Sequence, residues 1–234
     1  MNLAEYKGVY VFAQQVDNQI SSIALELIGK GKDLAKDLGT TVTAVLVGSN
    51  VKGLADELGE YGADKVIVVD DPELKDYRTE PYTHAITSVI NEFKPDIFLI
   101  GATAIGRDLG PRVCARIHTG LTADCTGLDY DVEAGNMVWT RPAFGGNLMA
   151  MILCPDNRPQ LGTVRPGVFK KPELVEGREG TITREDIHVA ADQIRTKLIE
   201  RIEEVAAAVN LEEAEIIVSG GRGVGSEEGF GVIR

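Results

Sequence analysis

The chain has 234 residues, of which 44% are hydrophobic and 26% are charged, a composition typical of a folded globular protein. Its 36 acidic and 24 basic residues give a net charge of -12, which argues against nucleic acid or an anionic membrane as the main partner. No apolar run approaches the ~20 residues that span a bilayer, and the first residues lack the pattern of a signal peptide, so we expect a cytoplasmic protein.

The first part of the chain alternates between short strand-like segments and longer helix-like ones. Runs of β-branched and aromatic residues predict strands, and apolar residues repeated every three to four positions predict helices. The predicted strands are residues 8–13, 41–47, 65–69 and 97–100. The predicted helices are residues 20–38, 51–58 and 83–93. Because strands and helices alternate, we expect right-handed crossovers and a mostly parallel sheet flanked by helices, which is the α/β fold class.

The fourth predicted strand leads into the stretch that has the clearest pattern of a ligand-binding edge. Small residues at 101–104 follow the strand and let a backbone or a ligand approach closely. The helix after them has its apolar face at Ile105, Leu109, Val113 and Ile117. A helix that begins at the carboxyl end of a strand places its N-terminal amides where open α/β sheets bind ligands. Asp108 and Arg112 are four residues apart and could pair, although arginines that simply face solvent are an equally good interpretation.

After residue 117 the pattern changes to short strands separated by turns. The predicted strands are residues 123–130, 137–143, 148–154 and 162–165, with turns at 134–136 and 144–147. We interpret these strands as an antiparallel extension of the sheet. Residues 166–183 combine prolines, glycines and charges, which indicates a linker or an extended arm.

The C-terminal part of the chain begins a new segment of structure. Residues 191–209 have a strong helical period, and residues 214–219 predict a strand followed by the glycine-rich sequence SGGRGVGSEEGFGVIR. A strand before a glycine-rich loop is the usual opening of a nucleotide-binding domain, but this loop matches neither GxGxxG nor the P-loop. A flexible tail is therefore an equally good interpretation.

Cysteine and histidine residues give no sign of a disulfide framework or a metal site. Cys114, Cys125 and Cys154 are odd in number and form no CxxC pair. The three histidines are far apart in sequence, and we find no Ser/His/Asp set or paired carboxylates at an informative spacing. We therefore expect neither catalytic residues nor metal ligands in this chain.

Four longer motifs stand in a fixed order along the chain. They are IGATAIGRDLGPRVCARIHTGLTADCTGLD, TRPAFGGNLMA, LGTVRPGV and IIVSGGRGVGSEEGF. Together they resemble the alpha subunit of electron-transfer flavoprotein over essentially the whole chain. The opening LAEYKGVYVFAQ, the segment VGSNVKGLADELGEYGADKV and the VRPG sequence are similar to the anaerobe-type, electron-bifurcating branch of that family.

The resemblance implies a nucleotide alpha-hydrolase-like α/β domain at residues 1–190, a helix or hinge at 191–213 and the start of an FAD-binding domain at 214–234. In the family that FAD domain would continue beyond Arg234, so the resemblance implies a truncated domain, and we expect the chain alone not to hold FAD tightly. It also implies a heterodimer with a beta subunit that passes electrons from NADH via FAD to an acyl-CoA dehydrogenase, with bifurcation to ferredoxin or flavodoxin. The chain would then be an electron carrier subunit rather than a stand-alone enzyme.

Two groups of residues match flavin-contacting positions of the family. Arg141, with Gly145 and Gly146, matches the arginine that is brought toward the beta-subunit flavin, where a fixed positive charge favours the reduced ring. The second group matches the loop that contacts the alpha-subunit FAD and consists of Ser219, Gly220, Gly221, Arg222 and Gly223. A surface arginine and a flexible tail are the respective alternatives. Arg165 is expected either at the interface or at the flavin, and the arginines of GRDLGPR and residues 122–124 at the interface or in the fold.

Two other classes of function stay open at this point. An adenine-nucleotide-binding domain on the same kind of sheet could act as an enzyme, but the sequence lacks a P-loop. A cofactor-free interaction scaffold is the other alternative. A flavin absorption spectrum would distinguish the carrier from the scaffold, and a nucleotide hydrolysis assay would test the enzyme.

Overall fold

The computed structural model describes residues 2–143, 145, 147–189, 194–202, 214 and 216–232. The chain divides into two units, Met1–Leu198 and Ile199–Arg234, and each is described by itself. The predicted domain boundaries at residues 190 and 213 stay predictions. None of the described helices is both long enough and apolar enough to cross a bilayer.

The first unit is built on a seven-stranded parallel sheet. Its strands are β1 (Val9–Phe12), β4 (Val42–Gly48), β5 (Lys65–Asp70), β6 (Ile97–Gly101), β7 (Leu121–Cys125), β11 (Gln160–Val164) and β12 (Thr181–Glu185). Their order is β12-β5-β4-β1-β6-β11-β7, and every neighbouring pair is parallel. The chain places β4 and β5 on one side of β1 and then crosses to place β6 on the other. Open α/β sheets bind ligands at the carboxyl end of such a switch point.

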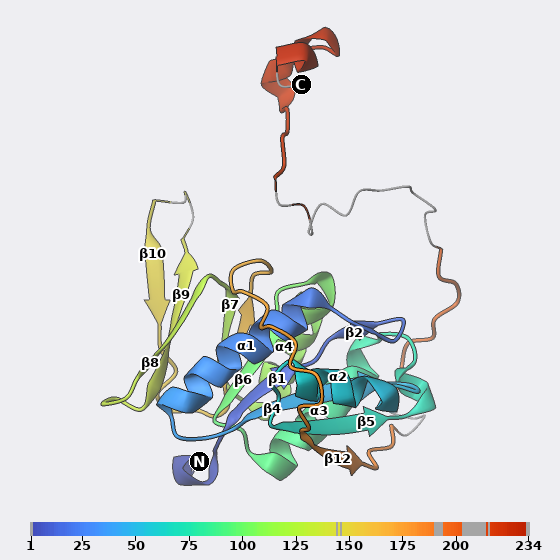
Figure 1. Cartoon of the computed structure of the whole chain (residues 1–234), viewed down its shortest axis with the longest axis vertical. Coiled ribbons are helices and arrows are strands. Elements are labelled where there is room, and N and C mark those ends of the chain that lie inside the picture. Colours follow the sequence, from blue (N-terminus) through green and yellow to red (C-terminus); the bar gives the residue numbers. More distant parts are fainter. Residues whose placement is uncertain are drawn as a thin grey trace. The chain divides into compact units, whose positions relative to one another are not determined.

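Helices cover both faces of this sheet, as Figure 1 shows. The residues of α1 (Ser22–Asp37) and α2 (Ala55–Glu60) pack into one apolar core, and those of α3 (Thr79–Phe93) and α4 (Ala104–Ile117) pack into the other. Because both faces are covered, the central strands are largely apolar, and β4 and β6 are buried at every position. The shorter elements are the 3-10 turns η1 (Leu3–Glu5), η2 (Lys52–Leu54) and η3 (Pro72–Leu74) and the two-stranded pair β2 (Gln15–Val16) and β3 (Gln19–Ile20).

Three further strands form an antiparallel sheet of their own. They are β8 (Gly127–Asp131), β9 (Asn136–Pro142) and β10 (Met149–Ile152), in the order β10-β9-β8. The fully buried Trp139 of β9 packs this sheet against the main one. A Cβ on Gly162 of β11 would overlap the Trp139 ring, so glycine leaves the room that the indole fills.

The strand predictions for this region need two corrections. The predicted strand 123–130 is two strands, β7 and β8, because the N–H of Thr126 donates to the Thr140 carbonyl and the chain turns there into the second sheet. Residues 162–164 belong to β11, which is parallel and lies between β6 and β7, and Arg165 follows it. Strand pairing is a long-range property, and the local sequence pattern does not contain it.

The elements of the first part of the chain are confirmed, with shifted ends. α3 begins at Thr79 rather than at residue 83, because its apolar period starts only after the first turn. That turn contains Pro81, which an α-helix tolerates there since the first-turn N–H groups have no helical partner. The short predicted helix 51–58 is η2 followed by α2.

Residues 166–180 form an extended arm that is held on the unit by hydrogen bonds. The N–H of Gly167 donates to Glu26 Oε2 at 2.9 Å. The guanidinium of Arg178 donates to the carbonyls of Gly59 and Ala63 at 2.6 and 2.7 Å. The arm ends in β12, which pairs with β5 at the edge of the sheet. Of the two predicted alternatives, a linker or an extended arm, the structure has the arm, which ends as an edge strand.

Two predicted elements near the C-terminus are wrong where the structure describes them. Residues 194–202 are not helical, and the N–H of Arg195 instead donates to Glu80 Oε2 at 2.7 Å. Residues 216–219 form no strand, since the described part of their unit provides no strand to pair with them. The remaining residues of the predicted helix 191–209 and strand 214–219, apart from Ala214, lie outside the described residues. The second unit also contains the 3-10 turns η6 (Arg222–Val224) and η7 (Glu228–Val232).

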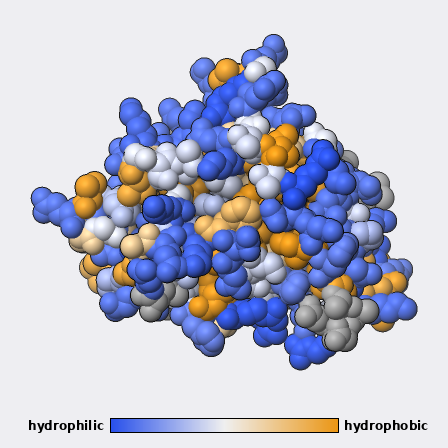
Figure 2. Space-filling view, turned by 90° about the horizontal axis from the view of Figure 1, so that it is seen from below, coloured by the Kyte–Doolittle hydropathy of each residue, from blue (hydrophilic) through white to orange (hydrophobic). Residues whose placement is uncertain are grey.

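One face of the molecule is largely polar. Figure 2 shows a face on which hydrophilic residues predominate and apolar residues form small separate groups. This agrees with the surplus of acidic residues in the chain.

Candidate functional site

Two polar side chains organise the carboxyl edge of the sheet at the β1/β6 switch point. Thr103 Oγ1 donates to Gln14 Oε1 at 2.6 Å and so links the loop after β6 to the loop after β1. The same hydroxyl accepts the N–H of Gly106 at 3.0 Å and caps α4. A Cβ on Gly106 would overlap the Gly101 carbonyl, so glycine lets α4 begin close to the end of β6. The small residues of this stretch therefore fix a helix N-terminus at the ligand-binding edge.

Beside this helix start lies a group of side chains that we call the Asp124 cluster: Asp124, Arg107, Arg141 and Arg165. Arg165 donates to the Asp124 carboxylate from Nη2 at 2.6 Å and from Nε at 3.3 Å. Arg107 donates to it from Nη2 at 3.2 Å, and its Nε is held by the Ala102 carbonyl at 2.8 Å. The hydrogen bond from Arg165 lowers the pKa of Asp124, and the charges of Arg107 and Arg141 lower it further. The carboxylate is therefore ionised at neutral pH, and the cluster keeps a positive charge.

Arg141 is the third cation of the cluster and comes from the antiparallel sheet. It lies in β9 opposite Ala150 of β10 and is half-buried. Within the described residues no hydrogen bond or ion pair holds its side chain. Burial raises the pKa of the Cys125 thiol to about 12, and the charge of Arg141 acts in the opposite direction on it. Arg141 is thus a cation at the edge of the cluster that no described residue neutralises directly.

The tip of the β9–β10 hairpin is open around Gly145. Its φ of +91° is a backbone conformation that favours glycine, and a Cβ there would meet no atom within 4 Å. Gly146, the other predicted residue of this tip, lies outside the described residues. The space around Gly145 allows another molecule to approach the tip closely.

β10 and the residues on either side of it expose apolar side chains at the edge of the antiparallel sheet. Leu148, Met149, Met151 and Leu153 are 70%, 55%, 75% and 53% exposed. Met149, Met151 and Leu153 alternate along the chain and therefore point to the same face. Figure 1 shows the β9–β10 hairpin projecting from the α/β body. A group of exposed apolar side chains on one strand indicates an interaction surface.

The glycine-rich loop predicted to contact FAD belongs to the second unit. Ser219, Gly220 and Gly221 precede η6, which contains Arg222 and Gly223. A Cβ at Gly221 or Gly223 would meet no atom within 4 Å, so the backbone is accessible. Arg222 is exposed, and within the described residues its side chain has no hydrogen-bond partner. Accessible amides and a guanidinium suit a phosphate or a flavin edge.

Comparison with known proteins shows the family. A family model described as the electron transfer flavoprotein domain matches residues 9–190. The chain belongs to the electron transfer flavoprotein family. It is 52% identical over 230 residues to Protein FixB of Clostridium saccharobutylicum, covering 98% of this chain and 68% of that protein. It is 50% identical over 230 residues to the electron transfer flavoprotein subunit alpha of Thermoanaerobacterium thermosaccharolyticum, covering 98% of this chain and 69% of that protein.

A third relative carries a more specific name. It is "Lactate dehydrogenase (NAD(+),ferredoxin) subunit LctC" of Acetobacterium woodii, 44% identical over 228 residues that cover 97% of this chain and 54% of that protein. These matches confirm the resemblance to electron transfer flavoprotein alpha subunits that the four motifs indicate.

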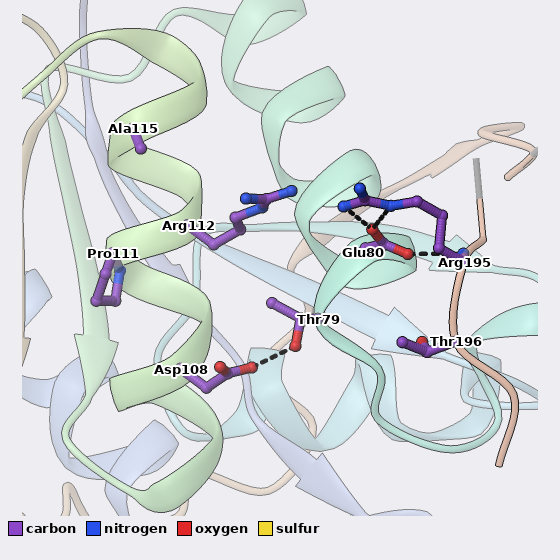
Figure 3. A pocket seen from close by; sticks show the side chains of 8 residues that line it. All are labelled: Thr79, Glu80, Asp108, Pro111, Arg112, Ala115, Arg195 and Thr196. Carbon is purple, nitrogen blue, oxygen red and sulfur yellow. Dashed lines mark hydrogen bonds and ion pairs between the residues drawn. The ribbon is translucent and has the colours of Figure 1, made fainter.

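A pocket of about 530 Å³ is a second place where this electron transfer flavoprotein domain could hold a ligand. It is lined by Thr79, Glu80, Asp108, Pro111, Arg112, Ala115, Arg195 and Thr196. Its carboxylates already have partners: Asp108 accepts hydrogen bonds from Tyr77 and Thr79 at 2.6 Å each, and Glu80 pairs with Arg195. Figure 3 shows Arg112 extending away from Asp108 and toward Glu80. The predicted Asp108–Arg112 pair is therefore not formed. The Asp108 carboxylate instead accepts hydrogen bonds from the hydroxyls of Tyr77 and Thr79.

The Asp124 cluster was only partly found by sequence reasoning. Arg141 was identified through the family resemblance, whereas Arg107 and Asp124 were assigned only to the interface or the fold. Arg107 follows β6, Asp124 lies in β7 and Arg165 follows β11, and these three strands are neighbours in the sheet. The carboxyl ends of these strands meet at one edge of the sheet. The position of each residue at the end of its strand, combined with the strand order, is the feature that indicates the cluster.

Proposed function

We propose that this chain acts as the alpha subunit of a heterodimeric electron transfer flavoprotein that passes electrons from NADH via FAD to an acyl-CoA dehydrogenase. Family membership supports electron transfer in a flavoprotein as the general function. The Acetobacterium relative is named for NAD(+) and ferredoxin, which supports bifurcation to ferredoxin or flavodoxin as the finer role. In that role the chain is an electron carrier subunit and not a stand-alone enzyme.

The observation that carries the proposal is the position of Arg141 on a projecting hairpin with an exposed apolar strand. The side chains of Met149, Met151 and Leu153 provide the apolar contact area that a stable subunit interface needs. Arg141 provides a positive charge that no direct partner neutralises within the described residues. We therefore assign this hairpin, together with the outer face of α4, to the contact with a beta subunit of the same family.

The residues at the hairpin fit a flavin that the beta subunit brings to the interface. When bound, FAD supplies the redox chemistry, since it can accept and release electrons. The guanidinium of Arg141 stays protonated at every relevant pH, so it is a fixed positive charge. A positive charge beside the ring favours the reduced, negatively charged flavin. Gly145 adds no side chain at its own position in the hairpin tip, which favours a close approach there.

We assign the alpha-subunit FAD to the glycine-rich loop of the second unit. The residues of this assignment are Ser219, Gly220, Gly221, Arg222 and Gly223. Its support is the accessible backbone at Gly221 and Gly223 and the exposed guanidinium of Arg222. Such a set can hold a pyrophosphate through amides and one charge-assisted hydrogen bond.

The experiment that tests this function is binding of the chain to a beta subunit of the same family. Met151→Asp places a charge in the middle of the exposed face of β10 and should weaken the complex about tenfold or more, because the charge would have to be desolvated. Val132→Asp is the matched control, since Val132 is 70% exposed in the turn between β8 and β9.

The affinities can be measured by calorimetry or analytical ultracentrifugation. The control should bind like the unaltered chain. Absence of any complex would contradict the proposed function. A complex that Met151→Asp leaves intact, or that both variants weaken equally, would contradict the assigned surface.

A further inference from the structure

Asp124 occupies an irregular position in β7. Its φ of +60° lies in the left-handed region, which residues other than glycine seldom adopt. The pairing of β7 with β11 shifts register beside Thr163, and the N–H of Asp124 donates to Thr163 Oγ1 at 2.9 Å. Bulges of this kind re-aim a side chain and are frequent next to functional sites. Here the carboxylate is directed to Arg107 and Arg165.

Fold stability does not explain this arrangement. The side chains of Asp124, Arg107 and Arg165 are 25%, 59% and 46% exposed. Ion pairs that are exposed to this extent stabilise a fold little. The left-handed backbone at Asp124 acts against the folded state. At Asp124 an uncommon backbone conformation holds ion pairs that stabilise the fold only weakly. This combination indicates that Asp124 has a functional role rather than a structural one.

We propose that Asp124 is a positioning residue that sets how much positive charge the cluster presents to the flavin of the partner subunit. This inference rests on the proposed function. By binding Arg107 and Arg165, the carboxylate fixes two guanidiniums at the edge of the sheet and offsets part of their charge. Arg141, which it does not bind, remains the cation of the hairpin. The net charge beside the flavin is therefore the sum of the Arg141 charge and the positive charge that Asp124 leaves on Arg107 and Arg165.

The test is a reductive titration of the complex between the chain and a beta subunit of the family, read against a dye of known potential. Asp124→Asn keeps the size of the side chain but removes its negative charge. The ratio of reduced to oxidised flavin at a fixed potential should rise about tenfold, which is ~30 mV for a two-electron couple. Asp124→Glu keeps the charge and should restore a potential near that of the unaltered protein. Asp64→Asn is the matched control, because Asp64 pairs with Arg178 of the arm at 2.7 Å.

Arg141→Ala in the same titration separates this inference from the proposed function. A shift with Arg141→Ala and none with Asp124→Asn overturns the role of Asp124 and leaves the function standing. No shift with either variant overturns both the role of Asp124 and the assignment of Arg141 to the flavin of the partner subunit. An equal shift with Asp64→Asn also overturns the inference, because the loss of any surface carboxylate would then have the same effect.

Arg165→Gln keeps the inference testable if Asp124→Asn does not reach a native circular dichroism spectrum. This variant leaves the Asp124 charge less neutralised, so the ratio of reduced to oxidised flavin should fall. The double variant Asp124→Asn/Arg165→Gln removes one charge of each sign and should bring the ratio back toward its original value. An unchanged ratio in Arg165→Gln overturns the inference.

Discussion

Among single residues, Arg141 has the most direct consequence for redox chemistry. Reduction adds negative charge to a flavin, and a nearby guanidinium favours that charge. We expect Arg141→Ala to lower the two-electron potential of the partner's flavin in the complete heterodimer, by ~30 mV for each ~1.4 kcal/mol of lost interaction. Arg141→Lys keeps the charge but lacks the planar fork, so it should be a partial substitute.

Reductive titration of wild-type and variant heterodimers measures this effect. Arg184→Ala is a suitable control, because Arg184 is an exposed arginine of β12, at the opposite edge of the main sheet. Identical flavin potentials in wild type and Arg141→Ala, with both proteins equally folded, would make Arg141 an ordinary surface residue of a hairpin.

His188 gives a pH-dependent prediction. Its ring lies 2.9 Å from Asp71 Oδ2 and 3.0 Å from Asp186 Oδ1. The hydrogen bond with Asp71 raises the pKa of His188, and the charge of Asp186 adds to this. Because the folded pKa lies above the unfolded one, the stabilisation is fully present below the unfolded value of about 6.5 and is lost as the pH rises through the folded pKa.

The corresponding variant is His188→Gln. It should lower the thermal unfolding temperature of the chain at about pH 5.5 and should have a smaller effect at about pH 8.5. Unfolding curves at the two pH values measure the difference. A gap between variant and wild type that does not change with pH would refute the role of this ion pair.

At the scale of elements, the contact between the two sheets depends on one glycine. A Cβ on Gly162 would overlap the Trp139 ring, so β11 and β9 would have to separate. We expect Gly162→Ala to lower the free energy of unfolding by about 1–3 kcal/mol, as overpacking in a core does. Gly53→Ala is the control, because a Cβ there meets no atom within 4 Å. Urea denaturation measures both, and equal stabilities of the two variants would contradict this packing.

The local repeat of apolar residues is enough to predict the elements whose buried side is evident from their own residues. The strands of the first part of the chain and the helices α1, α3 and α4 were predicted because their apolar residues repeat with the correct period. β7 and β11 were misassigned, since their parallel partners lie far away in sequence. Residues 194–202 have a helical period, but they form no regular secondary structure, and the N–H of Arg195 donates to Glu80 instead.

The candidate site was less predictable than the fold. Arg141 came from a family motif, and no local pattern shows that it lies near Asp124. The cluster forms only when β6, β11 and β7 are placed side by side and a bulge turns Asp124 toward two arginines. Strand order and backbone irregularities of this kind are set by the whole fold, so the residues alone could not indicate them.

At the scale of the first unit, exposed apolar surface is concentrated on the hairpin. Both faces of the main sheet are covered by helices, and its strands β4 and β6 are buried at every position. Among the described residues of this unit, the segment 148–153 carries four large apolar side chains that are more than half exposed. This group of exposed apolar side chains lies on the same hairpin as Arg141.

Hydrogen exchange of the chain, alone and bound to a flavin-containing beta subunit of its family, tests the central claim most directly. Exchange reports which backbone amides a partner covers. We predict that amides of residues 137–153 become protected in the complex, while those of β12, at the opposite edge of the main sheet, exchange as in the free chain. Protection confined to β12, or a complex that leaves residues 137–153 unprotected, would contradict the claim that the β9–β10 hairpin brings Arg141 to the flavin of the partner subunit.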